Sequence, residues 1–217
     1  MPVSRTESSY HPDLKQITPA YLKAEDLKVA ASILYNAYFD DPLFVNIFQA
    51  DREGYEARLR SAIREEINTF WESDQPLIGL YEDDRLLAVS CLIGPDASFG
   101  AGRFWHWRLK MLLTAGYFGT KQMIIKEEKV RDKIPAKNYY MLSLIGVHPD
   151  HQDMGLGHVL MSAMLGLLDE DNQSEGIGVL VTLPKCLSFF QSAKFEHVED
   201  IAVGNITGKV MFRPRHA

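Results

Sequence analysis

The chain has 217 residues, 46% of them hydrophobic and 24% charged, which is enough for one well-buried domain and too few for two. Its net charge of −6 argues against a nucleic-acid partner held through phosphate contacts. The two cysteines, Cys91 and Cys186, give no disulfide framework and favour a reducing cytoplasm. No apolar run is long enough to cross a bilayer, so we expect no membrane partner.

The predicted elements alternate between helices and strands. Residues 1–12 are polar and are expected to form a flexible N-terminus without the apolar core of a signal peptide. Apolar periodicity and turn residues then predict a short strand at 14–17, a helical region opened by Thr18-Pro19 and running to 38, helices at 43–49 and 55–71, a strand pair at 77–81 and 86–93, helices at 103–115 and 120–133, a strand at 139–147, a helix at 156–169, a strand at 178–182, a helix at 187–193, and strands at 195–201 and 206–212.

A glycine-bearing loop joins the strand at 139–147 to the helix at 156–169. The loop carries Gln152-x-x-Gly155-x-Gly157, and such a loop aims main-chain N–H groups and the positive end of a helix dipole at one point. An anion, most often a phosphate, belongs there. The dinucleotide fingerprint would need a glycine where Leu160 stands, and a P-loop would need lysine where His158 stands. An ordinary turn, whose glycines only ease packing, is the alternative.

The run Val147-x-Pro149-x-x-Gln152-x-x-Gly155-x-Gly157 closely resembles the acetyl-CoA pyrophosphate motif of the GCN5-related N-acetyltransferases. The resemblance implies an α/β fold, in which one domain over residues 13–217 holds a mixed, mostly antiparallel sheet flanked by helices. Two central strands of such a sheet splay apart. The helical stretch at about 96–137 would be an insertion in that domain.

Acetyl-CoA is the co-substrate that the resemblance implies. Its pyrophosphate would take N–H groups from the loop residues Gln152, Asp153, Met154, Gly155, Leu156, Gly157 and His158. Its pantetheine arm would bond to the main chain of Ile145, Gly146 and Val147, in the gap between the strands at 139–147 and 178–182. The N–H of Val147 would lie near the thioester carbonyl, and Phe190 would pack against the arm.

The catalytic groups are harder to assign. An attacking amine must lose a proton, because an ammonium has no free electron pair. The family often has a glutamate on the key strand where this chain has Met141, and a tyrosine where it has Phe190. Ser143 and Tyr139 should share the face of Met141 and could relay a proton through water, or they could be satisfied hydroxyls near the core.

The insertion adds further candidates. Glu127 and Glu128 could approach the site, although a solvated helix face is the plainer interpretation. The aromatic stretch around Phe104, Trp105, Trp107 and Tyr117 is interpreted first as a helix packed on the sheet. A lid that holds an amine by cation–π contact is the second interpretation. Membrane-surface binding is disfavoured because basic residues are few. The histidine spacing indicates no metal site.

The sequence therefore predicts an N-acetyltransferase that moves an acetyl group from acetyl-CoA to a primary amine of a small molecule or peptide by direct attack. Neither cysteine has a neighbour in the sequence that would activate it for a covalent intermediate. The alternative is an acyl-CoA-binding sensor or scaffold that keeps the fold without the catalytic groups. Whether the chain forms a homodimer is left open.

Overall fold

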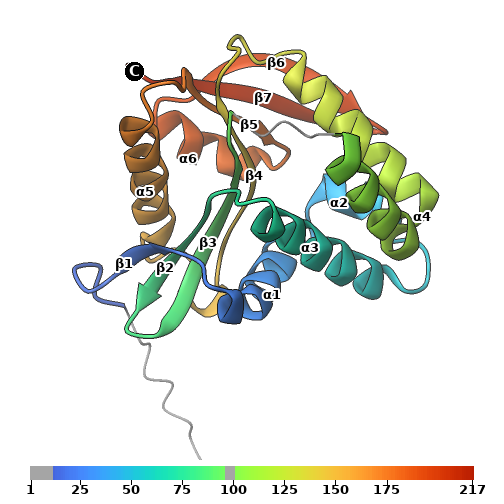
Figure 1. Ribbon diagram of the computed structural model, residues 1–217, viewed down its shortest axis with the longest axis horizontal. Helices are drawn as coiled ribbons and strands as arrows, with labels where there is room; N and C mark the ends of the chain where they lie inside the picture. The colour runs from blue at the N-terminus through green and yellow to red at the C-terminus, as the bar shows by residue number, and fades with distance from the viewer. Residues whose placement is uncertain (1–11, 96–100) are drawn as a thin grey trace, which may run out of the picture.

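A seven-stranded sheet runs through the centre of the structure (Figure 1). The computed structural model describes residues 12–95 and 101–217, and within them all side chains except those of 101–110, 114 and 115. The strands are β1 (Thr18–Tyr21), β2 (Leu77–Glu82), β3 (Arg85–Ile93), β4 (Tyr140–Val147), β5 (Gly176–Val181), β6 (Glu196–Val203) and β7 (Ile206–Pro214). They lie in the order β1-β2-β3-β4-β5-β7-β6, and only β4 and β5 are parallel.

Helices cover both faces of this sheet. They are α1 (Leu27–Tyr38), α2 (Pro42–Ile47), α3 (Tyr55–Glu72), α4 (Ala101–Arg131), α5 (Leu156–Glu170) and α6 (Leu187–Ser192), with short 3₁₀ turns η1 (Ala24–Asp26), η2 (Pro149–His151) and η3 (Pro184–Cys186). Helices α1 to α4 pack on one face, and α5 and α6 on the other. The predicted α/β class with a mixed, mostly antiparallel sheet is confirmed.

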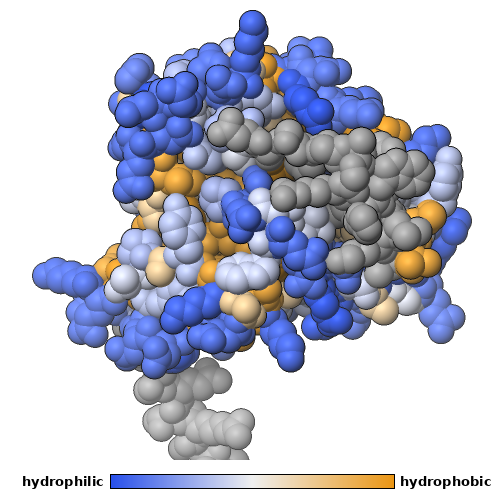
Figure 2. Space-filling view, in the orientation of Figure 1, coloured by the Kyte–Doolittle hydropathy of each residue, from blue (hydrophilic) through white to orange (hydrophobic). Residues whose placement is uncertain are grey.

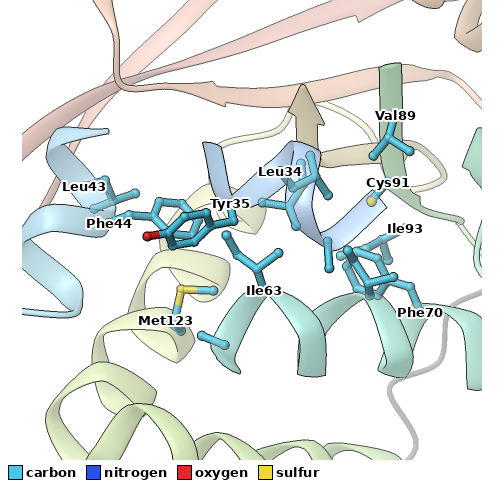
Figure 3. Close-up of a cluster of buried hydrophobic side chains, with 14 of the residues drawn as sticks. Leu34, Tyr35, Leu43, Phe44, Ile63, Phe70, Val89, Cys91, Ile93 and Met123 are labelled. Carbon is cyan, nitrogen blue, oxygen red and sulfur yellow. The ribbon is translucent and has the colours of Figure 1, made fainter. Parts of the chain in front are cut away.

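Each face of the sheet has its own hydrophobic core. Figure 3 shows side chains of the first core, where Leu34 of α1, Ile63 of α3 and Met123 of α4 point toward one another. In α3, Leu59, Ile63, Ile67 and Phe70 recur at helical spacing and are all buried, so this stripe fixes the helix on the core. The second core holds the buried stripe of α5. Figure 2 shows that the visible surface is mostly hydrophilic.

Two predicted features near the beginning of the described chain differ from the structure. The first strand lies at Thr18–Tyr21 and not at 14–17, and Thr18-Pro19 belongs to this strand and not to a helix. Because β1 is an edge strand, the missing N–H of Pro19 costs it little. The two helices predicted at 103–115 and 120–133 are confirmed as the two segments of α4, which meet at the non-helical residue Gly116, where φ is 74° and ψ is 174°.

Some predictions fall outside the described residues. The flexible N-terminus is one of them, since residues 1–11 are not described, and neither is the beginning of the insertion, residues 96–100. The description also leaves out the side chains of Phe104, Trp105 and Trp107. The structure therefore gives no contact that tests the lid interpretation. The described part of α4 packs into the first core through Met111, Met123 and Val130, and Leu113 and Tyr117 are exposed. Among the described residues, no helix has the length and apolar character needed to span a membrane.

A β-bulge divides strand β4 into two halves. Leu142 pairs with Leu92 and Leu144 pairs with Cys91, so Ser143 has no partner on β3. Before the bulge, Met141 packs against the first core. After it, Ile145 packs against the second. Alternation along the strand therefore holds up to Leu142 and shifts by one residue at Ser143.

Strands β4 and β5 part after only three residue pairs. Tyr140, Met141 and Leu142 pair with Ile177, Gly178 and Val179, and the ladder ends there. Strand β5 continues to Val181 along β7 on its other side. From Ser143 onward, one edge of β4 is thus free of a strand partner, which confirms the predicted splay.

Candidate functional site

The loop between β4 and α5 has the conformation of an anion-binding nest. Gly155, the N-cap residue of α5, has φ of 83° and ψ of −6°, and Asp153 has φ of 60°. Left-handed residues within a turn point successive N–H groups to one side of the chain. Glycine takes this conformation without the clash that a Cβ would cause.

Five N–H groups of this loop are not used by the protein itself. In the part of the chain that the structure describes, no acceptor bonds to the N–H groups of Asp153, Met154, Gly155, Leu156 and Gly157. The first N–H of α5 to be bonded is that of His158, 3.0 Å from the Gly155 carbonyl oxygen. Helix α5 has 15 residues, so its dipole adds positive potential at the same place. The unbonded N–H groups and the positive end of the helix dipole therefore suit the negative oxygens of a pyrophosphate.

The side chains around the loop hold it against the protein. Gln152 turns back and donates its Nε2 proton to the Val147 carbonyl oxygen at 3.4 Å. The ring of His158 packs edge-on against Phe189, with centroids 5.3 Å apart. A Cβ added to Gly157 would lie 3.2 Å from the Phe189 ring, so this glycine lets α6 approach the helix start.

Phe190 lies deeper than the loop. It is buried and packs between the rings of Phe189 and Phe195, at centroid distances of 5.1 and 5.4 Å. Phe190 also belongs to the second core. Its predicted contact with the cofactor arm stays a prediction.

Two histidines lie on the other side of the loop. The Nδ1 atom of His148 accepts a hydrogen bond from the Asp150 N–H at 3.3 Å, and its ring lies 5.4 Å from that of His151. His151 Nε2 lies 3.2 Å from the Arg85 guanidinium. Burial, followed by the charges of His148 and Arg85, lowers the pKa of His151. Among the described residues, no three His, Cys, Asp or Glu side chains are arranged to hold a metal ion.

Tyr38, the last residue of α1, reaches into the gap beside β4. Its hydroxyl oxygen accepts a hydrogen bond from the Ile145 N–H at 3.1 Å. Gly146 permits this approach, because a Cβ there would lie only 3.0 Å from Ala37 Cβ and 3.2 Å from Leu34. Burial raises the pKa of Tyr38 well above its ordinary value, although the Ile145 hydrogen bond opposes this rise.

A hollow opens beside the parting strands. It encloses about 440 Å³, part of it open to solvent, and residues of α1, α2, α4, β4 and β5 line it. Tyr38, Ser143 and Glu127 are among the lining residues. The Oγ atom of Ser143 is buried and has no hydrogen-bond partner within the described structure. The bulge thus directs an unused hydroxyl toward this space.

An ion pair from the insertion helix lines the same hollow. Lys126 Nζ lies 2.8 Å from Glu127 Oε1, and the side chains are 9% and 22% exposed. Burial opposes the charge of Lys126, but the carboxylates of Glu127 and Glu66 outweigh burial and hold its pKa above the ordinary value. Glu128, by contrast, is exposed. For Glu127 the plainer interpretation, a solvated helix face, is therefore wrong, whereas it holds for Glu128.

Asp41 links the beginning of helix α2 to the end of strand β5. Its Oδ1 accepts hydrogen bonds from the N–H groups of Leu43 at 2.9 Å and Phe44 at 3.2 Å, which caps α2. Its Oδ2 accepts the hydroxyl proton of Thr182 at 2.6 Å, directly after β5. Asp41 and Pro42 thus form the N-cap and the first residue of α2, which begins soon after α1 ends at Tyr38.

The remaining candidates lie around this arrangement. Tyr139 is half-buried and packs edge-on against Phe212 at 6.5 Å, outside the set of residues that line the hollow. Burial raises its pKa, and Glu127 adds to the rise while Arg131 opposes it. Burial also raises the pKa of Cys91 and of Cys186, so both thiols stay protonated and are poor nucleophiles.

Comparisons with known proteins agree with this geometry. The structure resembles a histone acetyltransferase HPA2 and related acetyltransferase from Corynebacterium glutamicum (TM-score 0.68, 14% identity, 92% of this chain and 96% of that one). It also resembles a GCN5-related N-acetyltransferase from Rhodopseudomonas palustris (TM-score 0.56, 14% identity, 94% and 99%). A third neighbour is yncA from Salmonella typhimurium, solved with its cofactor acetyl-CoA (TM-score 0.53, 16% identity, 92% and 94%). The chain thus has the fold of the GCN5-related N-acetyltransferases.

Sequence comparison adds less. No family model matches the chain. A protein of Dictyostelium discoideum named as a probable serine/threonine-protein kinase is 25% identical over 189 residues, and the match covers 78% of this chain. The chain spans only about a fifth of that relative's length, 20%.

Four residues at the gap were not among the predicted site residues: Tyr38, Asp41, Lys126 and Thr182. A lysine next to Glu127 on a predicted helix resembles an ordinary surface pair, and Tyr38 fits the apolar stripe of α1. The dipeptide Asp41-Pro42 is the one local hint, because aspartate before proline often caps a helix.

Proposed function

We propose that this chain transfers an acetyl group from acetyl-CoA to a primary amine of a small molecule or peptide, by direct attack of the amine. The observation that carries the proposal is the row of five unbonded N–H groups, Asp153 to Gly157, beside the gap between β4 and β5. Acetyl-CoA, when bound, supplies an acyl group activated as a thioester. The fold of the acetyltransferase neighbours, one of them solved with acetyl-CoA, supports the same assignment.

Main-chain groups do most of the binding in this proposal. The unbonded N–H groups of Asp153 to Gly157 take the pyrophosphate, whereas the N–H groups of Gln152 and His158, also predicted to do so, are bonded to Pro149 and Gly155. The main chain of Ile145, Gly146 and Val147 takes the pantetheine arm. The N–H of His148 bonds to the Leu87 carbonyl on β3 at 2.8 Å. Because N–H directions alternate along a strand, the N–H groups of Val147 and Ile145 face the gap. We assign the Val147 N–H to the arm close to the thioester.

The hollow next to the gap suits the amine. Glu127 presents a carboxylate there, and only its Oε1 is paired with Lys126. We assign Glu127 to bind the amine and to receive its proton, with the buried hydroxyl of Ser143 positioned to relay it. Tyr139 stays a candidate second relay through water.

A second function has specific support. Met141 and Phe190 occupy the positions at which the family pattern often carries its polar catalytic groups, and Phe190 is sealed in an aromatic cluster. A chain that binds acyl-CoA without turnover, as a sensor or scaffold, would have this composition.

Two measurements separate these functions. CoA and acetyl-CoA at about 100 times their dissociation constant should stabilise the fold by about 2.7 kcal/mol, with NAD and ATP as controls. Thiol release from acetyl-CoA should then be followed with a panel of primary amines from pH 6 to 10. Release that depends on the amine supports the transferase. Binding without release with any amine supports the sensor, and a melting curve that CoA leaves unchanged contradicts both.

A further inference from the structure

The hydroxyl of Tyr38 has a proton that the protein does not use. A phenol has one proton to donate and two electron pairs to accept with. The Tyr38 oxygen accepts the Ile145 N–H at 3.1 Å, and within the described residues its own proton has no acceptor. The ring packs against Phe44 with centroids 4.7 Å apart, so the hydroxyl is held in place.

This proton lies where the proposed chemistry needs a donor. Tyr38 lines the hollow together with Ser143 and Thr182. Ser143 follows the last residue of β4 that pairs with β5, and Thr182 follows the end of β5. The Ile145 N–H faces the same gap but is already bonded to Tyr38. Accepting that bond polarises the Tyr38 O–H and makes it a stronger donor. The Tyr38 O–H thus takes the place of the Ile145 N–H as the hydrogen-bond donor that faces the gap.

We propose, on the basis of the acetyl transfer proposed above, that Tyr38 is a catalytic residue whose O–H binds the carbonyl oxygen of the acyl thioester in the gap. As the amine nitrogen bonds to the acyl carbon, one electron pair of the carbonyl moves to its oxygen, and Tyr38 stabilises the charge there. When the carbonyl re-forms, the C–S bond breaks and its electron pair leaves on sulfur as a thiolate. The proton of the amine passes to Glu127.

Tyr38 keeps its own proton throughout. Its raised pKa lies far above that of a thiol, near ~8.5, so giving a proton to the leaving sulfur would be unfavourable. Hydrogen bonding to a developing charge requires no such transfer. This role is therefore distinct from that of an acid on α6, which Phe190 cannot fill.

The test compares Tyr38→Phe with Tyr35→Phe, which removes the hydroxyl of a buried tyrosine in the same helix. Calorimetry should measure the binding of CoA and of the unreactive ketone analogue of acetyl-CoA in which CH₂ replaces sulfur. Tyr38→Phe should bind CoA like the parent but lose about tenfold in affinity for the analogue. With a reactive amine its kcat should fall by about 10²-fold or more, without a shift of the pH profile. Tyr35→Phe should leave both affinities unchanged.

The outcomes are distinguishable. Unchanged analogue affinity in Tyr38→Phe would overturn the role of Tyr38 and leave the transferase proposal intact, whereas a parent that binds neither ligand would overturn the transferase proposal itself. If Tyr38→Phe does not fold, NMR spectra of the amide groups of the parent protein, recorded with the analogue and with CoA, test the role of Tyr38. A resonance of the Ile145 N–H that moves with the analogue but not with CoA supports the role of Tyr38, and a change confined to Val147 contradicts it.

Discussion

Replacing Gly155 by alanine tests whether the loop before α5 binds CoA through its left-handed main chain. With φ of 83°, Gly155 lies where an L-residue costs about 1–2 kcal/mol. The new Cβ would lie 3.3 Å from Leu14 Cδ1, the end of a side chain that can move. Main-chain strain should therefore dominate the effect.

This strain lowers either the stability of the free Gly155→Ala variant or its affinity for CoA. If the free variant keeps the left-handed loop, its melting temperature falls by about 2–8 °C and its affinity for CoA is unchanged. If the free loop relaxes, stability is kept, and CoA binds about 5–30-fold more weakly because binding must restore the loop. The two losses together should amount to about 1–2 kcal/mol.

Thermal melting and calorimetry with CoA measure both losses. Gly166→Ala is the matched control, since Gly166 lies inside α5 and a Cβ there meets nothing within 4 Å. It should gain about 0.5–1 kcal/mol of stability and bind CoA like the parent. Two results would refute the reasoning: losses in Gly155→Ala that sum to zero, or an affinity loss far above 100-fold, which would mean that the Cβ itself obstructs the ligand.

Three further predictions concern the gap, the aromatic cluster and alkaline pH. Glu127→Gln should lower kcat for an amine by about 10²-fold or more, and the exposed Glu128→Gln should not, in assays of thiol release; equal effects would contradict the assignment. Phe190→Tyr should lose about 1–3 kcal/mol in urea unfolding without a gain in rate, because a hydroxyl would be buried among Phe189 and Phe195; activity that appears only in this variant would indicate a sensor parent. Burial raises the pKa of Tyr55 from 10.0 to about 12, so the unfolded chain loses this proton first and stability falls between pH 10 and 12; unfolding midpoints should fall less steeply there for Tyr55→Phe.

The loop could be predicted because its signal is local. Val147 to Gly157 form one continuous stretch, and the hydrogen bonds, the glycine geometry and the helix start all lie inside it. The mixed, mostly antiparallel sheet followed from the family resemblance that this stretch carries, whereas the order of the strands was not predicted. Strand β1 was misplaced because Thr18-Pro19 has the form of a helix opening, and only its pairing with β2 makes it an edge strand.

The catalytic side of the site depends on contacts between distant segments. Tyr38 meets Ile145 only because Gly146 lets α1 pack closely on β4. Glu127 reaches the hollow because α4 packs on the first core, and neither contact leaves a pattern in neighbouring residues. The bulge at Ser143 is also invisible locally, since it is a mismatch in register with β3.

The bulge places Met141 and Ile145, four residues apart on strand β4, on opposite faces of the sheet. A change in side-chain volume at Met141 is transmitted to helices α1 to α4, whereas the same change at Ile145 is transmitted to α5 and α6. Deleting Ser143 would remove the bulge and bring Leu144 directly after Leu142, and Ile145 and Val147 would keep their present face, on the second core. The strand would lose the hydroxyl that lines the hollow without a partner among the described residues. The extra residue is therefore not needed for the alternation of β4, and its consequence lies in the polar lining of the hollow.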